Sequence, residues 1–148
     1  MTLRLPTGEV TVLLGEQIVR RRLMDMLDDS SAREETGRPA TVHRVSAGAS
    51  EGVAPRRRRL EDAGSADAAA IVLVDHLTDG LDAAGRRAVL GALATVAARG
   101  AAVLVDDGDC VAALAMADGT LRADPVRGLV LEPASGSAAP LEELYRAS

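Results

Sequence analysis

The chain has 148 residues and a formal charge of −5, and all its basic residues other than two histidines are arginines. This length suits one domain with a sizeable core, and the single cysteine, Cys110, excludes a disulfide scaffold or a zinc cluster. Tyr145 is the one aromatic residue, so the chain lacks the rings that stack on single-stranded nucleic acid, and we expect no nucleic-acid partner. No uncharged run approaches the roughly 20 residues that span a bilayer, and residues 1–10 show no signal-peptide pattern. We therefore expect a cytoplasmic protein without direct membrane insertion.

The N-terminal part predicts a strand, a turn, a second strand and a helix. Leu3 and Leu5 alternate with polar residues, and the Pro-Thr-Gly sequence at 6–8 is typical of a turn. Residues 10–14 form a short apolar run, which indicates a strand. From Glu16 onward the apolar residues recur at helical spacing, so a helix follows this strand.

Residues 30–66 differ from the rest because they are rich in Gly, Ser and Arg. We expect a mostly irregular insert here. At most, it would hold a strand at 41–45 and a helix near 56–63.

The middle of the chain carries the clearest pattern. Residues 70–74 are a continuous apolar run that ends at Asp75, which is typical of a strand buried on both faces of a parallel sheet. Asp82 is placed to cap a helix over residues 83–99, and residues 101–105 repeat the buried-strand pattern.

The C-terminal part predicts smaller elements. We expect a helix over about 109–117, strands at 120–122 and 129–131, and a short terminal helix at 140–147. Strands that alternate with helices indicate a parallel sheet joined by helical crossovers. The predicted fold class is therefore α/β, with a mostly parallel sheet and flanking helices.

Two blocks of the chain resemble the ABC-type ATPases, the ATP-binding domains of ABC transporters. The Gly-Glu turn and strand of residues 8–14, followed by Gly15, resemble the stretch that leads into the family's phosphate-binding loop. Residues 71–82 (Ile-Val-Leu-Val-Asp-His-Leu-Thr-Asp-Gly-Leu-Asp) look like the family's Walker B strand and the loop that ends in Gly-Leu-Asp. Residues 83–105 and 117–121 are similar to the segments around and after the family's switch histidine.

This resemblance implies a P-loop-NTPase-like sheet in a single ABC-ATPase-like domain over residues 1–148, with 123–148 as a C-terminal extension. The helical signature subdomain would be lacking, because the span between Gly15 and Asp75 is too short to hold it. Arg21 lies near the position of the phosphate-loop lysine, and Asp75 is at the Walker B position, where the family places Mg²⁺. ATP and Mg²⁺ are thus the cofactors that the resemblance allows, with these candidate binding residues: Gly15, Arg21, Asp75 and Asp82, of which Asp75 is the candidate metal ligand.

Several residues depart from the family pattern. A working phosphate-binding loop needs glycines whose N–H groups converge on phosphate oxygens, followed by a lysine and a hydroxyl residue. Here Ile18 and Val19 stand where glycines are needed, and β-branched side chains disfavour positive φ. Arg22 replaces the hydroxyl residue, His76 occupies the position of the catalytic glutamate, and Gly108 lies where the switch histidine is expected. The site is therefore predicted to be degenerate, with His76 as the one residue at a catalytic position.

These departures predict an ABC transporter ATP-binding-protein-like subunit that does not hydrolyse ATP and acts as a structural or regulatory partner in transport. The Ser-Ala-Gly sequence at 46–48 is only a faint counterpart of the family's signature motif, so the chain would not complete a partner's nucleotide site. The expected partner is an intact ABC ATPase, a transport subunit or a second copy of the chain. Such a partner would hold the chain at the membrane periphery.

Other interpretations remain open at this stage. His76 beside Asp75 would support weak Mg²⁺-dependent nucleotide hydrolysis, because a neutral imidazole accepts a proton. Alternatively, Asp75 would be the phospho-acceptor of a receiver-like signalling module, although such a module needs two acids after its first strand and Glu16 is only one. A third set of acids resembles the metal site of topoisomerase-primase type domains: Glu16, Asp106, Asp107 and Asp109.

The remaining polar features each have a structural and a functional interpretation. The runs Arg20 to Arg22 and Arg56 to Arg59 would either hold an anion or form solvated faces, and neighbouring acids favour solvated faces for the second run. No residue stands at a spacing from Cys110 or His43 that is typical of a catalytic pair or a metal site. We therefore expect packed residues rather than a reactive thiol or a metal ligand.

Overall fold

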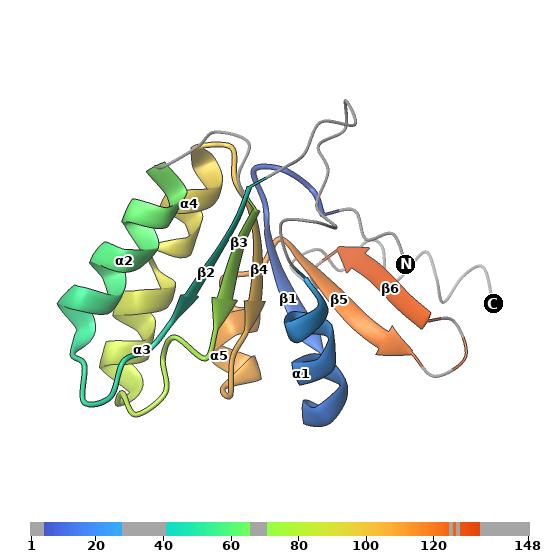
Figure 1. The fold of residues 1–148 in the computed structure, drawn as a ribbon, viewed down its shortest axis with the longest axis horizontal. Coiled ribbons are helices and arrows are strands. Elements are labelled where there is room, and N and C mark those ends of the chain that lie inside the picture. The colour runs from blue at the N-terminus through green and yellow to red at the C-terminus, as the bar shows by residue number, and fades with distance from the viewer. Residues whose placement is uncertain (1–4, 28–40, 66–70, 125, 127, 134–148) are drawn as a thin grey trace.

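A computed structural model describes residues 5–27, 41–65, 71–124, 126 and 128–133. These residues form a six-stranded sheet with helices packed on both faces (Figure 1). The elements in chain order are β1 (Val10–Leu14), α1 (Gln17–Met26), β2 (Val42–Ser46), α2 (Val53–Ser65), β3 (Ile71–Asp75), α3 (Ala83–Leu90), α4 (Leu93–Ala98), β4 (Ala102–Asp106), α5 (Cys110–Leu114), β5 (Gly119–Asp124) and β6 (Gly128–Pro133).

The strand order is β2-β3-β4-β1-β5-β6. Neighbouring strands from β2 to β5 are parallel, and β6 pairs antiparallel with β5. The chain starts at the central strand β1, moves to β2 at one side, and returns through β3 and β4 to the other side of the sheet. The α/β fold class with a mostly parallel sheet is confirmed.

The core lies on both faces of the sheet because successive side chains of a strand point to opposite faces. In β3, Val72 and Val74 join a large cluster with α2, α3, α4 and α5, whereas Leu73 joins a smaller cluster on the other face. The smaller cluster is covered by Leu23 and Met24 of α1. The two buried strands predicted in the middle of the chain are confirmed, each one residue further along than expected.

The single helix expected over residues 83–99 is instead two helices, α3 and α4. They are separated at Gly91 and Ala92, where the N–H of Ala92 donates to the carbonyl of Val89 in a tighter, three-residue turn. Glycine is a weak helix former, which explains why the regular hydrogen-bonding pattern changes there. The cap is as predicted, because the Asp82 carboxylate accepts a hydrogen bond of 2.7 Å from the N–H of Gly85.

The strand expected at 41–45 and the helix expected near 56–63 are both present, so the described part of 30–66 is more regular than the mostly irregular insert that we expected. Residues 41–65 contain β2 and α2, and both elements contribute side chains to the core, Val45 from β2 and Leu60 from α2. These two buried residues hold a polar segment in place, which its composition alone did not indicate. Only residues 47–52 connect β2 to α2, so no helical subdomain is inserted between them.

The two ends of the chain are described in part. Leu5 is not in a strand, and the other residues of the strand expected at the start lie outside the described residues. The strand expected at 129–131 is confirmed as β6, whereas the terminal helix expected at 140–147 lies outside the described residues. None of the described helices is long and apolar enough to cross a bilayer.

Candidate functional site

The candidate site lies at the edge of the sheet where the parallel strands end. The pairing register aligns Ser46 of β2 with Asp75 of β3, and Asp75 with Asp106 of β4. Open α/β sheets bind their ligands at this edge, because loops and helix N-termini converge there. The strand β1 ends at the same edge and leads into α1 through Gly15 and Glu16.

The connection from β1 to α1 consists of two residues, Gly15 and Glu16. Gly15 adopts a φ of 125°, which lets the chain turn, and Glu16 has an extended conformation before the helix begins at Gln17. Ile18 and Val19 are therefore inside α1, and neither needs a positive φ. This corrects the expectation that Ile18 and Val19 stand within a loop, because both lie in the first turn of a helix.

Arg20 crosses from α1 to the end of β4 and forms a buried ion pair. Its side chain is 9% exposed, and Nη1 bonds to Oδ1 of Asp106, whose side chain is 2% exposed. The same nitrogen lies 3.3 Å from the carbonyl oxygen of Asp107. Burial raises the pKa of Asp106 above its ordinary value, against the opposing positive charge of Arg20. The sequence interpretation of Arg20 as an anion-binding or solvated residue did not include this internal partner.

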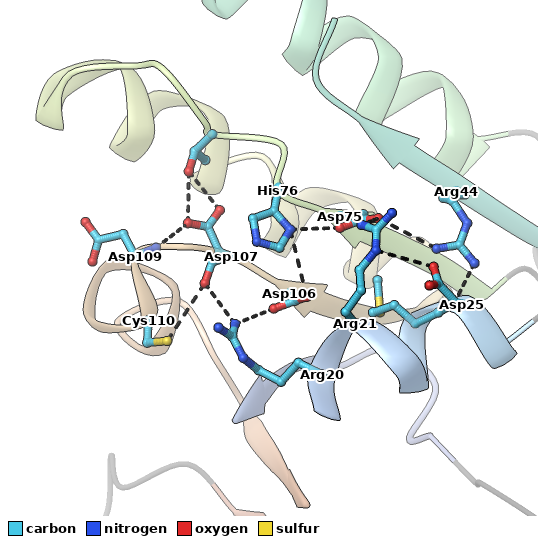
Figure 2. Close-up of polar contacts among 12 residues, drawn as sticks. Arg20, Arg21, Asp25, Arg44, Asp75, His76, Asp106, Asp107, Asp109 and Cys110 are labelled. Atoms are coloured by element: carbon cyan, nitrogen blue, oxygen red, sulfur yellow. Dashed lines mark hydrogen bonds and ion pairs between the residues drawn. The ribbon is translucent and has the colours of Figure 1, made fainter. Parts of the chain in front are cut away.

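Asp75 lies between two further arginines (Figure 2). Nη1 of Arg21 is 3.3 Å from Oδ2 of Asp75, and Nη1 of Arg44 is 3.8 Å from the same oxygen. Arg44 also donates to the carbonyls of Met24 and Leu27 at the end of α1, at 2.6 and 3.1 Å. The candidate Mg²⁺ ligand thus has positive charge beside it from this chain's own side chains.

His76 directly follows β3 and has a left-handed backbone conformation, with a φ of 51°. Its N–H donates to the carbonyl of Asp106 at 2.8 Å, and its ring Nδ1 lies 2.8 Å from Oδ1 of Asp75. Burial alone would lower the pKa of His76, but the bond to Asp75 and the charges of Asp106 and Asp79 outweigh it and raise the pKa above its ordinary value. These contacts hold the imidazole over the ends of β3 and β4, as Figure 2 shows.

The acids after β4 do not assemble as the topoisomerase-primase resemblance requires. Both carboxylate oxygens of Asp107 lie within 2.9 Å of the hydroxyl of Thr78, and Oδ1 also accepts from the N–H of Asp109. Asp109 caps α5 by accepting from Ala112, and it pairs with Arg86 at 3.1 Å. The acidic residues that converge with His76 are Asp75 and Asp106. Asp107 and Asp109 therefore order the loop between β4 and α5.

Arg56, the first residue of the arginine run, is a structural residue that the sequence interpretation missed. Its side chain lies in the interior, and Nη1 donates to the carbonyls of Leu77 and Asp79, at 3.0 and 2.5 Å. Its Nε and Nη2 both donate to the carbonyl of Glu51. Arg56 thus ties the loop that carries His76 to the connection between β2 and α2.

A pocket of about 810 Å³ opens at this edge of the sheet. Arg21, Asp75 and His76 line it, whereas Gly15 and Asp82 do not. Of the four candidate cofactor-binding residues, the structure therefore brings only Arg21 and Asp75 to the pocket. The full lining is Gln17, Ile18, Arg21, Arg44, Ser46, Ala47, Asp75, His76 and Asp79.

These residues do not fit the Mg²⁺–ATP of an ABC-type site. Such a site surrounds the phosphates with loop N–H groups, but only two residues separate β1 from α1. Arg22 stands at the position where the family resemblance expects the hydroxyl residue that holds Mg²⁺. Nδ1 of His76 lies against Asp75, whereas Mg²⁺ prefers oxygen ligands in octahedral geometry.

Comparison with known proteins identifies the fold through solved structures. No protein-family model matches the chain, and no curated protein matches it. The ATP-binding subunit of an ABC transporter superposes with a TM-score of 0.58 at 11% identity, covering 98% of this chain and 90% of that one. The cbiO1 protein of Clostridium perfringens, described as part of the ABC transporter complex cbiONQ, gives a TM-score of 0.54 at 14% identity, covering 97% of this chain and 84% of its own. A structure named RNase-L Inhibitor gives a TM-score of 0.53 at 14% identity over 97% of this chain and 38% of its own. The chain therefore has the α/β fold of an ABC-ATPase-like domain.

Proposed function

We propose that this protein is a non-hydrolysing ABC-ATPase-like subunit that serves as a structural or regulatory partner in transport. One observation carries the proposal: α1 follows β1 after Gly15 and Glu16, so the loop that would hold a triphosphate is missing. The fold of an ATP-binding subunit is thus retained without the part that binds the phosphates.

The charges at the site support the same proposal. An ATPase uses a basic side chain to neutralise phosphate oxygens and an aspartate to hold Mg²⁺. Here Arg20 is paired with Asp106, and Arg21 lies against Asp75, so these charges already compensate one another. Withdrawing one partner from a buried pair such as Arg20–Asp106 costs about 3–5 kcal/mol. A nucleotide would have to offset that cost with few N–H groups to bind it.

The proposed partner is an intact ABC ATPase, a transport subunit or a second copy of the chain. The cbiO1 protein, which shares the fold, is described as part of a transporter complex, and this favours a role within an assembly. Docking on such an assembly would place the chain at the membrane periphery.

The direct test uses the full chain, with an active ABC ATPase as the positive control. We expect no phosphate release from Mg²⁺–ATP above the buffer rate and no change in melting temperature. A ligand present at 100 times its Kd would stabilise the fold by about 2.7 kcal/mol, so even moderate binding would be visible. Saturable stabilisation by Mg²⁺–ATP would refute the proposal and favour the nucleotide-binding alternative, and turnover that is lost in His76→Ala would favour the weak enzyme.

A further inference from the structure

We infer that Asp75, His76 and Asp106 form a binding site for a Zn²⁺-like divalent cation at the carboxyl end of the sheet. Each residue offers one ligand atom, and these three atoms lie within 4.8 Å of one another. The site goes beyond the proposed function and needs no nucleotide, so each can fail without the other.

The separations suit a small tetrahedral cation. Nδ1 of His76 is 2.8 Å from Oδ1 of Asp75 and 3.8 Å from Oδ2 of Asp106. With metal–ligand bonds of about 2.0–2.1 Å, ligand atoms in a tetrahedral site are about 3.3 Å apart. These two separations lie on either side of that value, each about half an ångström from it, and the two carboxylate ligand atoms lie within 4.8 Å of each other.

The arginines hold the carboxylates in position, as residues that hydrogen-bond to metal ligands do in known metal sites. Arg20 bonds to Oδ1 of Asp106, and Arg21 bonds to Oδ2 of Asp75. The other oxygen of each carboxylate is the one that lies toward Nδ1 of His76 (Figure 2). Hydrogen-bonded outer partners of this kind fix ligating carboxylates in protein metal sites.

The backbone conformation and its hydrogen bonds also fix the position of His76 beside the two acids. A left-handed conformation at a residue other than glycine is uncommon and persists where the surrounding structure imposes it. Here the N–H of His76 donates to the carbonyl of Asp106, and Arg56 fixes the next residue of the loop through its carbonyl. The imidazole is therefore held close to both acids before any cation arrives.

The charge balance and the ligand types select the class of cation. Asp79 adds a carboxylate next to the two ligand acids, and Asp25 adds one beside Arg21. Against the three guanidinium groups of Arg20, Arg21 and Arg44, these four carboxylates leave one net negative charge when the imidazole is neutral. One imidazole with two carboxylates suits Zn²⁺, Co²⁺ or Ni²⁺ better than Mg²⁺. Two of the ligand residues line the pocket, which leaves the fourth position open to water or an anion.

The test titrates Zn²⁺ into the untagged full chain after treatment with a chelator, and follows binding by calorimetry. We expect one Zn²⁺ per chain. The decisive variant is His76→Asn, because asparagine tolerates the left-handed backbone better than other residues and keeps the loop intact. This variant should bind Zn²⁺ at least about tenfold more weakly, because it removes a direct metal ligand. Even the loss of a residue that only hydrogen-bonds to a ligand lowers metal affinity about 10–100-fold. Asp75→Asn should weaken binding to a similar extent.

The chain offers matched controls, because its only other histidine and its only cysteine are His43 and Cys110. His43→Asn and Cys110→Ser should bind Zn²⁺ as the unaltered chain does. Visible absorption of bound Co²⁺, expected for the unaltered chain and lost in His76→Asn, reports the same site independently, and the melting temperature without metal checks that each variant folds. Absence of binding at millimolar Zn²⁺, or binding by a folded His76→Asn chain as tight as that of the unaltered chain, would overturn the inference.

Discussion

The ion pair between Arg20 and Asp106 supports the sharpest stability prediction. Both side chains are at least nine-tenths buried, and Asp106 ends β4, which pairs with β1 in the middle of the sheet. Replacing Arg20 by methionine keeps much of the side-chain volume but leaves the Asp106 carboxylate buried without its main partner. Breaking a buried pair in this way costs about 3–5 kcal/mol. For a chain of this size, that corresponds to a fall in melting temperature of roughly 6–20 °C.

The assay is thermal and urea unfolding of the full chain, followed by circular dichroism at neutral pH. Arg21→Met is the matched control, because Arg21 is 59% exposed and its contact with Asp75 is 3.3 Å long, so its loss should cost at most about 1 kcal/mol. The double change Arg20→Met with Asp106→Leu removes both charges and should recover most of the lost stability.

The pH dependence of the Arg20→Met variant provides a second check. Burial already raises the pKa of Asp106, and removing the guanidinium raises it further. The destabilisation should therefore be greatest at neutral pH and should diminish in acid, where the carboxyl group is protonated. A variant that stays within about 1 kcal/mol of the unaltered chain at neutral pH would refute the assignment of this pair as a buried structural interaction.

Three further changes test other parts of the structure. Arg56→Ala removes the donors for three loop carbonyls and should lower the free energy of unfolding by about 2–4 kcal/mol. Arg57→Ala loses only a half-exposed ion pair and should change the free energy of unfolding by less than about 1 kcal/mol. Equal destabilisation of the two variants in urea would contradict the role of Arg56. Gly64→Ala would place its Cβ 2.5 Å from Cγ1 of Val96, so it should destabilise the packing of α2 on α4 by about 1–3 kcal/mol; an unchanged melting temperature would show that this contact is looser than described. The N–H of Ala112 donates to the Asp109 carboxylate and lowers the pKa of Asp109. The charged carboxylate therefore stabilises the fold above the ordinary pKa of an aspartate, and this contribution is lost as the pH falls through the lowered pKa. The difference in melting temperature between the unaltered chain and Asp109→Asn should accordingly shrink in acid, and a difference that grows there would contradict this assignment.

The sheet could be predicted from the sequence because its buried strands carry their own signal. The apolar runs before Asp75 and Asp106 need no long-range information, since any strand covered on both faces has this composition. In the described part of 30–66, the strand and the helix could be located from the sequence, but their full extent and their place in the core could not, because only a few buried residues such as Val45 and Leu60 stabilise them within a polar segment.

The site could be predicted only in outline. Asp75 could be predicted from the buried strand that it ends and His76 from the family resemblance, and the structure brings both to the pocket. The partner of Arg20 could not be predicted, because the pairing joins α1 to β4 across 86 positions of the sequence and depends on the order of strands in the sheet. The left-handed conformation of His76 gave no signal either, because the glycine or asparagine that usually marks such a position is absent there.

The central claim is that the connection between β1 and α1 cannot receive a triphosphate. The most direct measurement is a titration of the ¹⁵N-labelled full chain with Mg²⁺–ATP, followed through the backbone amide resonances of Gly15, Glu16 and Gln17. We expect these resonances to stay in place up to millimolar nucleotide. A saturable displacement of these three amides together would contradict the claim.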